Sequence, residues 1–167
     1  MDNQEILEFG IKRENEERRD GGCAVVFDPE TKLFAVGKDN VNGFLRFFGG
    51  GVDKNEDAQT GILRELTEES GLDDFLYVEK ISEVLVHYYN RIKKVNRFAH
   101  ATCFLVILKS RNLVETKLEE HENFILDWAG AETLFSDWKS RNQEKDYDHW
   151  FYFLEKSMKR IKELGFN

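Results

Sequence analysis

Apolar residues occur in short runs along the first third of the chain, and these runs predict strands separated by turns. Two of them cover residues 23–27 and 33–36. Pro29 lies in the polar segment between them, where its fixed backbone angle favours a turn. A third run, residues 44–48, stops at three consecutive glycines, residues 49–51. We expect a short strand that ends at these glycines.

Longer apolar patterns follow in the second half of the chain. Residues 77–89 and 98–108 predict two long strands, and residues 90–97 form a basic loop between them. The second strand contains an uninterrupted apolar run, residues 103–108, which is typical of a strand covered on both faces. Residues 124–128 predict a last strand. The chain therefore supplies enough strands for one sizeable sheet.

Helical patterns lie on either side of the long strands. Residues 56–70 predict a helix that Asn55 caps and that ends at Gly71. Two helices are expected near the C-terminus, the second over residues 146–164, where apolar residues recur at helical spacing. Strands flanked by helices predict the α/β class, arranged as an α/β/α sandwich. We expect a single domain over residues 1–167, in which residues 1–20 form an N-terminal extension.

The composition of the chain excludes several classes of protein. Hydrophobic residues make up 41% of the chain, which excludes a disordered protein, and no stretch reaches the roughly 20 apolar residues of a membrane helix. The charged N-terminus lacks a secretory signal pattern, so we expect a cytoplasmic protein. A net charge of −8 argues against broad binding to nucleic acids or membranes. Cys23 and Cys103 lie in apolar runs, and we expect free thiols.

The candidate chemistry lies just after the glycines. Glu65, Glu68 and Glu69 have the spacing i, i+3, i+4, which puts them on one face of the predicted helix. At 4 Å, each like-charged pair costs roughly 1 kcal/mol in water and roughly 4 kcal/mol at an effective dielectric constant of about 20. A solvated acidic face is the alternative for such a cluster alone. Here Arg64 and the glycines adjoin it, which favours a bound Mg²⁺ or Mn²⁺.

This segment resembles the Nudix box, G-x5-E-x7-R-E-U-x-E-E-x-G-U, in which U is a bulky aliphatic residue. Every defined position matches, namely Gly50, Glu56, Arg64, Glu65, Leu66, Glu68, Glu69, Gly71 and Leu72. The resemblance implies the Nudix fold, a mixed β-sheet between helices. It also implies a hydrolase that cleaves a nucleoside diphosphate linked to another moiety and depends on Mg²⁺ or Mn²⁺.

The same resemblance implies roles for individual residues. The metal ligands would be Glu65, Glu68 and Glu69, with the Gly50 carbonyl as a fourth. Arg64 would orient Glu65, and Glu56 would support the loop through a salt bridge. Glu65 is the first candidate for the catalytic base. Some members of the family use a glutamate outside the box, and for that role we favour Glu122 among the nearby Glu119, Glu120 and Glu122.

Substrate contacts are harder to assign from the sequence. Arg46, just before the glycines, is our candidate for a phosphate contact. Phe48 is the candidate for stacking on a base, and core packing is its alternative.

Several functions stay open within the family resemblance. The short N-terminal segment favours a nucleoside triphosphate or a compact dinucleotide as substrate. The alternatives are a hydrolase of ADP-ribose or nucleotide sugars, a non-catalytic nucleotide sensor, and an isomerase of isoprenoid diphosphates. That isomerase would need a cysteine in its pocket, and we have no argument that Cys103 faces the box. The expected partner is a small nucleotide, and a homodimer is left open.

Overall fold

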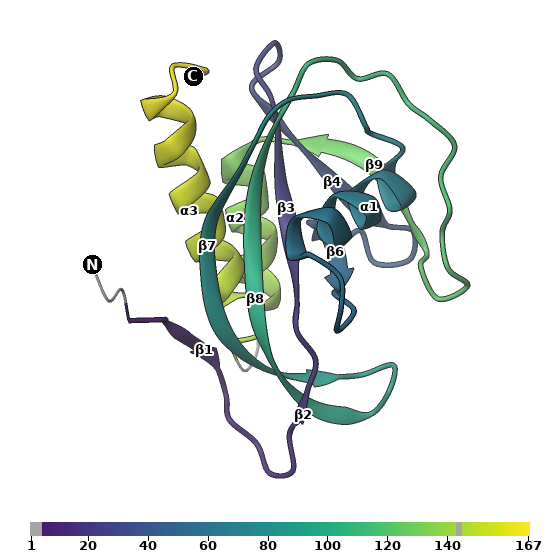
Figure 1. Cartoon of the computed structure of the whole chain (residues 1–167), viewed down its shortest axis with the longest axis vertical. Coiled ribbons are helices and arrows are strands. Elements are labelled where there is room, and N and C mark those ends of the chain that lie inside the picture. Colours follow the sequence, from purple (N-terminus) through teal and green to yellow (C-terminus); the bar gives the residue numbers. More distant parts are fainter. Residues whose placement is uncertain (1–4, 143–144) are drawn as a thin grey trace.

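The computed structural model describes residues 5–142 and 145–167 (Figure 1). In this part of the chain one sheet contains nine strands, with the order β1-β7-β8-β3-β4-β5 along its main path. The strands are β1 (Glu8–Gly10), β2 (Glu17–Arg18), β3 (Gly21–Asp28), β4 (Leu33–Asp39), β5 (Leu45–Arg46), β6 (Phe48–Gly51), β7 (Phe75–Asn90), β8 (Val95–Leu108) and β9 (Phe124–Ala129). The helices are α1 (Ala58–Ser70), α2 (Ala131–Arg141) and α3 (Asp148–Glu163).

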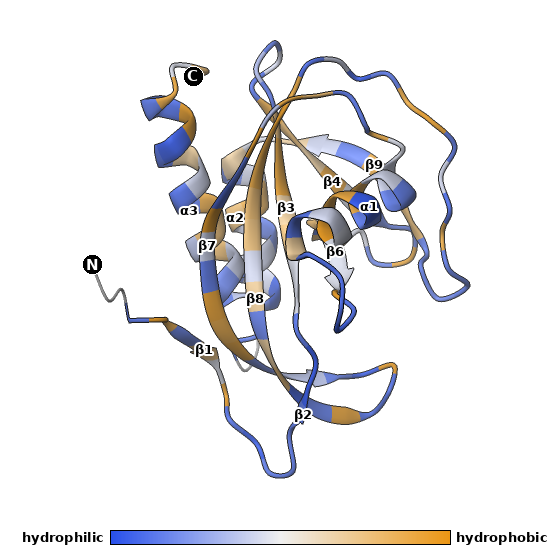
Figure 2. Cartoon of the chain, in the orientation of Figure 1, coloured by the Kyte–Doolittle hydropathy of each residue, from blue (hydrophilic) through white to orange (hydrophobic). Residues whose placement is uncertain are grey.

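Helices cover both faces of this sheet, as Figure 1 shows. On one face α1 buries Ile62 and Leu66 against Phe104 of β8. On the other face α2 and α3 bury Trp138 and Leu154 in a second core. Alternate residues of β3 and β8 contribute to the two cores, which is why residues 23–27 and 103–108 of these strands are apolar, and these parts of the strands are orange in Figure 2. The predicted α/β/α sandwich with a mixed sheet is confirmed.

The sheet is mixed because its two central strands run parallel. β3 pairs with β8 in parallel, with Gly22 opposite Thr102, while β7 and β8 form a long antiparallel hairpin. β3 also pairs with β6 in antiparallel fashion, which brings Gly50 opposite Gly22. This last pairing holds the glycines next to α1, whose side chains pack on β3 and β6. The middle of the sheet therefore positions the candidate site.

Two local predictions need correction. The glycines do not end a strand but form most of β6, because a backbone without side chains can pair closely with Gly21 and Gly22 of β3. The cap of α1 is Asp57 rather than Asn55, since the Asp57 carboxylate accepts a hydrogen bond of 3.2 Å from the backbone N–H of Thr60. The predicted end of this helix at Gly71 is confirmed by its positive φ of 82°.

The N-terminal segment is part of the sheet rather than a mere extension, although residues 1–4 lie outside the described residues. β1 pairs in parallel with β7, and β2 pairs in parallel with β8. His87 of β7 reinforces this arrangement, because its ring nitrogens contact the carboxylates of Glu8 and Glu16. These strands were missed because each is only two or three residues long and lacks apolar alternation.

Other properties of the described chain agree with the sequence. Cys23 and Cys103 are buried free thiols that lie opposite each other on β3 and β8. Within the described residues, no helix is both long enough and apolar enough to cross a membrane.

Candidate active site

The most buried acidic side chain of the candidate site is Glu69, near the end of α1. Its side chain is only 1% exposed. One carboxyl oxygen accepts a hydrogen bond of 2.9 Å from the backbone N–H of Gly49, and the other lies 3.4 Å from Nη2 of Arg46. Gly49 has a φ of 153°, and a Cβ there would lie 2.2 Å from the Gly22 carbonyl oxygen, so only glycine fits. Helix α1 and strand β6 are thus joined at this carboxyl group.

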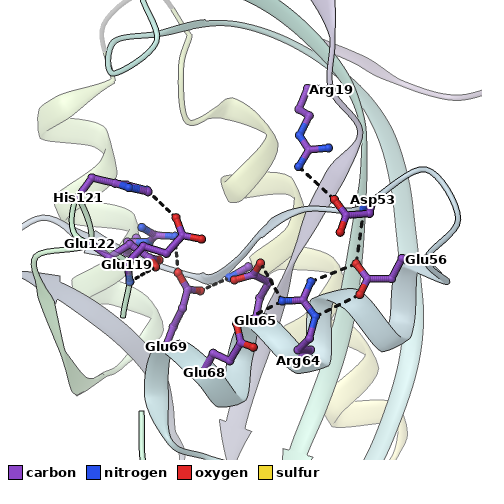
Figure 3. Close-up of polar contacts among 12 residues, drawn as sticks. Arg19, Asp53, Glu56, Arg64, Glu65, Glu68, Glu69, Glu119, His121 and Glu122 are labelled. Atoms are coloured by element: carbon purple, nitrogen blue, oxygen red, sulfur yellow. Dashed lines mark hydrogen bonds and ion pairs between the residues drawn. The ribbon is translucent and has the colours of Figure 1, made fainter. Parts of the chain in front are cut away.

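Arg64 organises the other glutamates of α1, as Figure 3 shows. Its Nε and Nη2 each donate a hydrogen bond of 3.1 Å to Glu56, which forms a two-pronged contact. Its Nη1 lies 3.2 Å from Glu68 and 3.4 Å from Glu65. The hydrogen bonds to Glu56 raise the pKa of Arg64 above its ordinary value. The guanidinium therefore ties the loop before α1 to two of the candidate metal ligands.

Glu122 reaches the same place from a distant part of the chain. The segment before β9 runs along the end of α1, where Lys117 donates a backbone hydrogen bond of 2.7 Å to the Glu68 carbonyl. This course brings the Glu122 side chain next to Glu69 (Figure 3). His121, its neighbour, lies 3.5 Å from Glu119. The structure thus places Glu122 beside a box glutamate.

Burial and neighbouring groups shift the pKa values of these carboxyl groups. It raises the pKa of Glu69 to about 9, and the hydrogen bond with Glu122 acts in the same direction. For Glu122, burial also acts to raise the pKa, but the hydrogen bonds from Glu69 and from the Glu119 backbone outweigh it and lower the value. Burial also raises the pKa of Glu65 against the opposing charge of Arg64.

The chemistry of these donors suits a hard divalent cation. Carboxylate and carbonyl oxygens are the ligands that Mg²⁺ and Mn²⁺ prefer. Gly50 is exposed and faces Glu65, because a Cβ on Gly50 would lie 3.5 Å from the Glu65 carboxyl carbon. Glu68, Glu69 and Glu122 supply further oxygens nearby (Figure 3). Burial and the neighbouring Glu122 raise the pKa of Glu69, and a cation at this place would relieve repulsion between the two carboxylates.

In this structure the glutamate side chains of α1 pair with arginines. Across residues 5–142 and 145–167, no three histidine, cysteine, aspartate or glutamate side chains form a group that could hold a metal ion as they stand. Arg64 holds Glu65 and Glu68, while Arg46 holds Glu69. To share a cation, Glu65 and Glu68 must turn away from Arg64, and their side chains, which are 21% and 32% exposed, can do so by single-bond rotations.

The two candidates for substrate contact differ in placement. Arg46 lies at the site, with its guanidinium 4.5 Å above the Phe124 ring and one nitrogen toward Glu69. Its side chain is 29% exposed, so one edge faces solvent. Phe48 is completely buried between α1 and the sheet. Its ring has no free face for a base, which corrects the expectation of a stacking role.

One cation at the site escaped the sequence analysis. Arg19 lies against Gly51, and its Nη2 is 3.7 Å from Asp53 (Figure 3). It belongs to a charged N-terminal run that carries no motif. Its place follows only from the pairing of β2 with β8, which no local pattern announces.

Comparisons with known proteins identify the family and the fold of this chain. A family model described as NUDIX domain matches residues 17–151. The fold is similar to that of the NUDIX domain of Shewanella oneidensis NrtR, solved as a complex with ADP ribose, at 14% identity and a TM-score of 0.61, covering 87% of this chain and 90% of that one. No curated protein sequence matches the chain.

Two further solved structures share the fold. A C. elegans Ap4A hydrolase binary complex has 15% identity and a TM-score of 0.59, and the match covers 87% of this chain and 98% of that one. The MutT protein from Methanosarcina mazei Go1 has 15% identity and a TM-score of 0.57, with 90% and 99% covered. The family model spans most of the chain, including β2, the glycines, α1 and Glu122. The chain belongs to the NUDIX domain family and has the fold and the motif of a Nudix hydrolase.

Proposed function

We propose that the protein is a metal-dependent pyrophosphohydrolase that cleaves a nucleoside diphosphate linked to another moiety. The observation that carries the proposal is the convergence of Glu65, Glu68, Glu69 and Glu122 beside the exposed backbone of Gly50. Nudix hydrolases generally use divalent metal ions, and this set of oxygens suits Mg²⁺ or Mn²⁺. The ligands would be Glu65, Glu68, Glu69 and the Gly50 carbonyl.

The cation, when bound, supplies positive charge that neutralises the diphosphate and makes water easier to deprotonate. Side chains of the protein would hold the reacting groups in place and accept the proton. Glu65 is our first candidate to accept a proton from the water that attacks phosphorus, because burial raises its pKa and so makes it a stronger base than an exposed glutamate. Arg64 would keep Glu65 in place, and Glu56 would keep Arg64 in place. Glu122 is the second candidate for the base.

The products follow from this reaction. Water adds to phosphorus, the P–O bond of the anhydride breaks, and a nucleoside monophosphate and the second phosphorylated fragment leave. Arg46 is placed to contact a phosphate oxygen through the exposed part of its side chain while it stays beside Glu69.

The substrate we favour is a nucleoside triphosphate or a compact dinucleotide. β1 occupies the edge of its own sheet by pairing with β7. The described part of the N-terminal segment therefore pairs within the chain's own sheet. Similarity to an Ap4A hydrolase and to a NUDIX domain solved with ADP ribose supports a dinucleoside polyphosphate and ADP-ribose as the next substrates to test.

A substrate panel tests the proposal. Nucleoside triphosphates, dinucleoside polyphosphates, ADP-ribose and nucleotide sugars are incubated with the protein and Mg²⁺ or Mn²⁺, and chromatography identifies the products. Release of a nucleoside monophosphate from one of them supports the proposal. A nucleotide that binds tightly yet survives prolonged incubation with either metal would instead establish the non-catalytic sensor.

A further inference from the structure

The backbone of Arg19 is held on two sides next to the glycines of β6. Its own N–H donates a hydrogen bond of 3.0 Å to the Phe98 carbonyl of β8. The carbonyl of the next residue, Asp20, accepts one of 3.0 Å from the N–H of Val52. Arg19 is therefore fixed between the long hairpin and the loop that leads into α1, although it lies more than thirty positions before that loop in sequence.

The Arg19 side chain occupies the space above Gly51. A Cβ built on Gly51 would lie 2.5 Å from Nη2 of Arg19 and 2.8 Å from both Cζ and Nε. Any other residue at position 51 would push the guanidinium away. The Arg19 guanidinium thus stands where a side chain of residue 51 would begin. Its partner Asp53 links it to the loop before α1, because the Asp53 N–H contacts Glu56 and Glu56 pairs with Arg64 (Figure 3).

Compared with the other two arginines of the site, Arg19 is weakly engaged. Arg64 contacts three glutamates, and Arg46 is packed between Glu69 and Phe124. Arg19 forms an ion pair of 3.7 Å with Asp53, and these two side chains are 44% and 75% exposed. Such an exposed pair contributes little and exchanges easily for a stronger anion.

We propose that Arg19 binds the diphosphate of the substrate, so that the N-terminal segment completes the active site. This inference rests on the proposed function. A guanidinium presents two parallel N–H groups that match two phosphate oxygens, and it keeps its charge at every working pH. In this role Arg19 releases Asp53 and contacts non-bridging oxygens, where it stabilises the charge that grows on the departing phosphate as the P–O bond breaks.

The experiment compares four proteins on the best substrate of the panel. Arg19→Ala removes the guanidinium, and Arg19→Lys keeps only a point charge. Gly51→Ala leaves Arg19 in the sequence but places a methyl group where the guanidinium lies. Arg18→Ala is the matched control, because Arg18 is the neighbouring arginine but contacts Asp20 and the Phe98 ring instead.

We expect kcat/KM to fall about 10- to 100-fold in Arg19→Ala, the worth of one hydrogen bond to a charged group. Gly51→Ala should show a similar loss, Arg19→Lys a smaller one, and Arg18→Ala a change of less than about twofold. Calorimetry with a non-hydrolysable methylene-bridged nucleotide provides a second measurement, in which Arg19→Ala should weaken binding and Arg18→Ala should not.

The outcomes separate this inference from the proposed function. If the native protein turns over a nucleotide and Arg19→Ala matches it in both kinetics and binding, only the role of Arg19 is refuted. Equal losses in Arg18→Ala and Arg19→Ala would also refute it, since they would indicate a general charge effect. If the native protein neither binds nor cleaves any nucleotide of the panel, the proposed function fails and this inference fails with it.

Discussion

The Glu122 side chain lies beside the Glu69 carboxyl group across the junction between α1 and the loop that precedes β9. Two carboxyl groups in such contact must share a proton unless a cation replaces it. Because Gly49 and Arg46 hold Glu69 from the other side, the carboxyl pair has little freedom to separate. At this contact the Nudix box meets the loop that carries Glu122, and the first predictions concern the glutamates of the box.

Glu68→Gln and Glu69→Gln should each lower kcat by roughly a hundredfold or more while the protein stays folded. At position 69, glutamine keeps an oxygen that can accept the hydrogen bond from the Gly49 N–H. Both substitutions remove the negative charge that a cation needs. Steady-state kinetics with Mg²⁺ measures the loss, and circular dichroism confirms the fold. Glu155→Gln, on the exposed side of α3, is the control and should retain activity. Native turnover in both box variants would refute the proposed site.

Removing divalent cations should abolish turnover, and adding Mg²⁺ or Mn²⁺ back should restore it. A cation that binds the folded state alone also raises the melting temperature in proportion to the logarithm of its concentration. Thermal melts over a Mg²⁺ titration should therefore shift upward in the native protein and stay flat in Glu68→Gln. Activity that persists in excess chelator would argue against the metal-dependent reaction.

Arg64→Lys should reduce kcat about tenfold, because lysine cannot reproduce the two-pronged contact with Glu56 while reaching Glu65. The free energy of unfolding should change by less than about 1 kcal/mol, since Arg64 is 38% exposed. Arg160→Lys is a matched control, because Arg160 also pairs with two glutamates but on α3. Kinetics and urea unfolding of both variants test this, and equal kinetic losses would count against a positioning role.

The cap of α1 gives a prediction about stability alone. Asp57→Ala should lower the free energy of unfolding by about 1 kcal/mol, because it removes the acceptor for the Thr60 N–H. Asn55→Ala should change stability by much less, since Asn55 does not cap the helix. Urea unfolding of the two variants decides between them, and a larger effect at Asn55 would contradict the structure.

His87 makes attachment of the N-terminal segment depend on pH. Burial acts to lower the pKa of His87, but the hydrogen bonds and charges of Glu8 and Glu16 outweigh it and raise the value above 6.5. The stabilisation is fully present below the unfolded-state pKa near 6.5 and is lost as pH rises through the folded-state value. Urea unfolding at pH 6 and at pH 8.5 should show this loss in the native protein and a flatter profile in His87→Phe. Identical profiles would exclude the contact as a source of stability.

The sequence was informative where side chains alternate or recur. The apolar runs of β3 and β8 predicted central strands because both faces of those strands are buried. The motif identified Glu65, Glu68 and Glu69, and the expected outside glutamate, Glu122, does lie beside Glu69. Its catalytic role stays a prediction.

Other features carry no such local signal. Glycines in β6 have no side chains to alternate, so pairing with β3 alone reveals that strand. β1 and β2 are too short for a period, and the place of Arg19 depends on tertiary pairing. Phe48 is buried because α1 packs over it. A run of apolar residues in the sequence does not tell whether such a ring is covered in this way or is exposed for stacking on a base.

The adjacent cysteines of β3 and β8 provide a built-in reporter of unfolding. Both thiols are buried, Cys103 completely and Cys23 to within 6% exposure, on central strands of the sheet. An alkylating reagent can reach them only when those strands separate, so its rate reports opening of the core rather than fraying at the termini. Mass spectrometry of the labelled protein would thus follow ligand protection without an introduced probe.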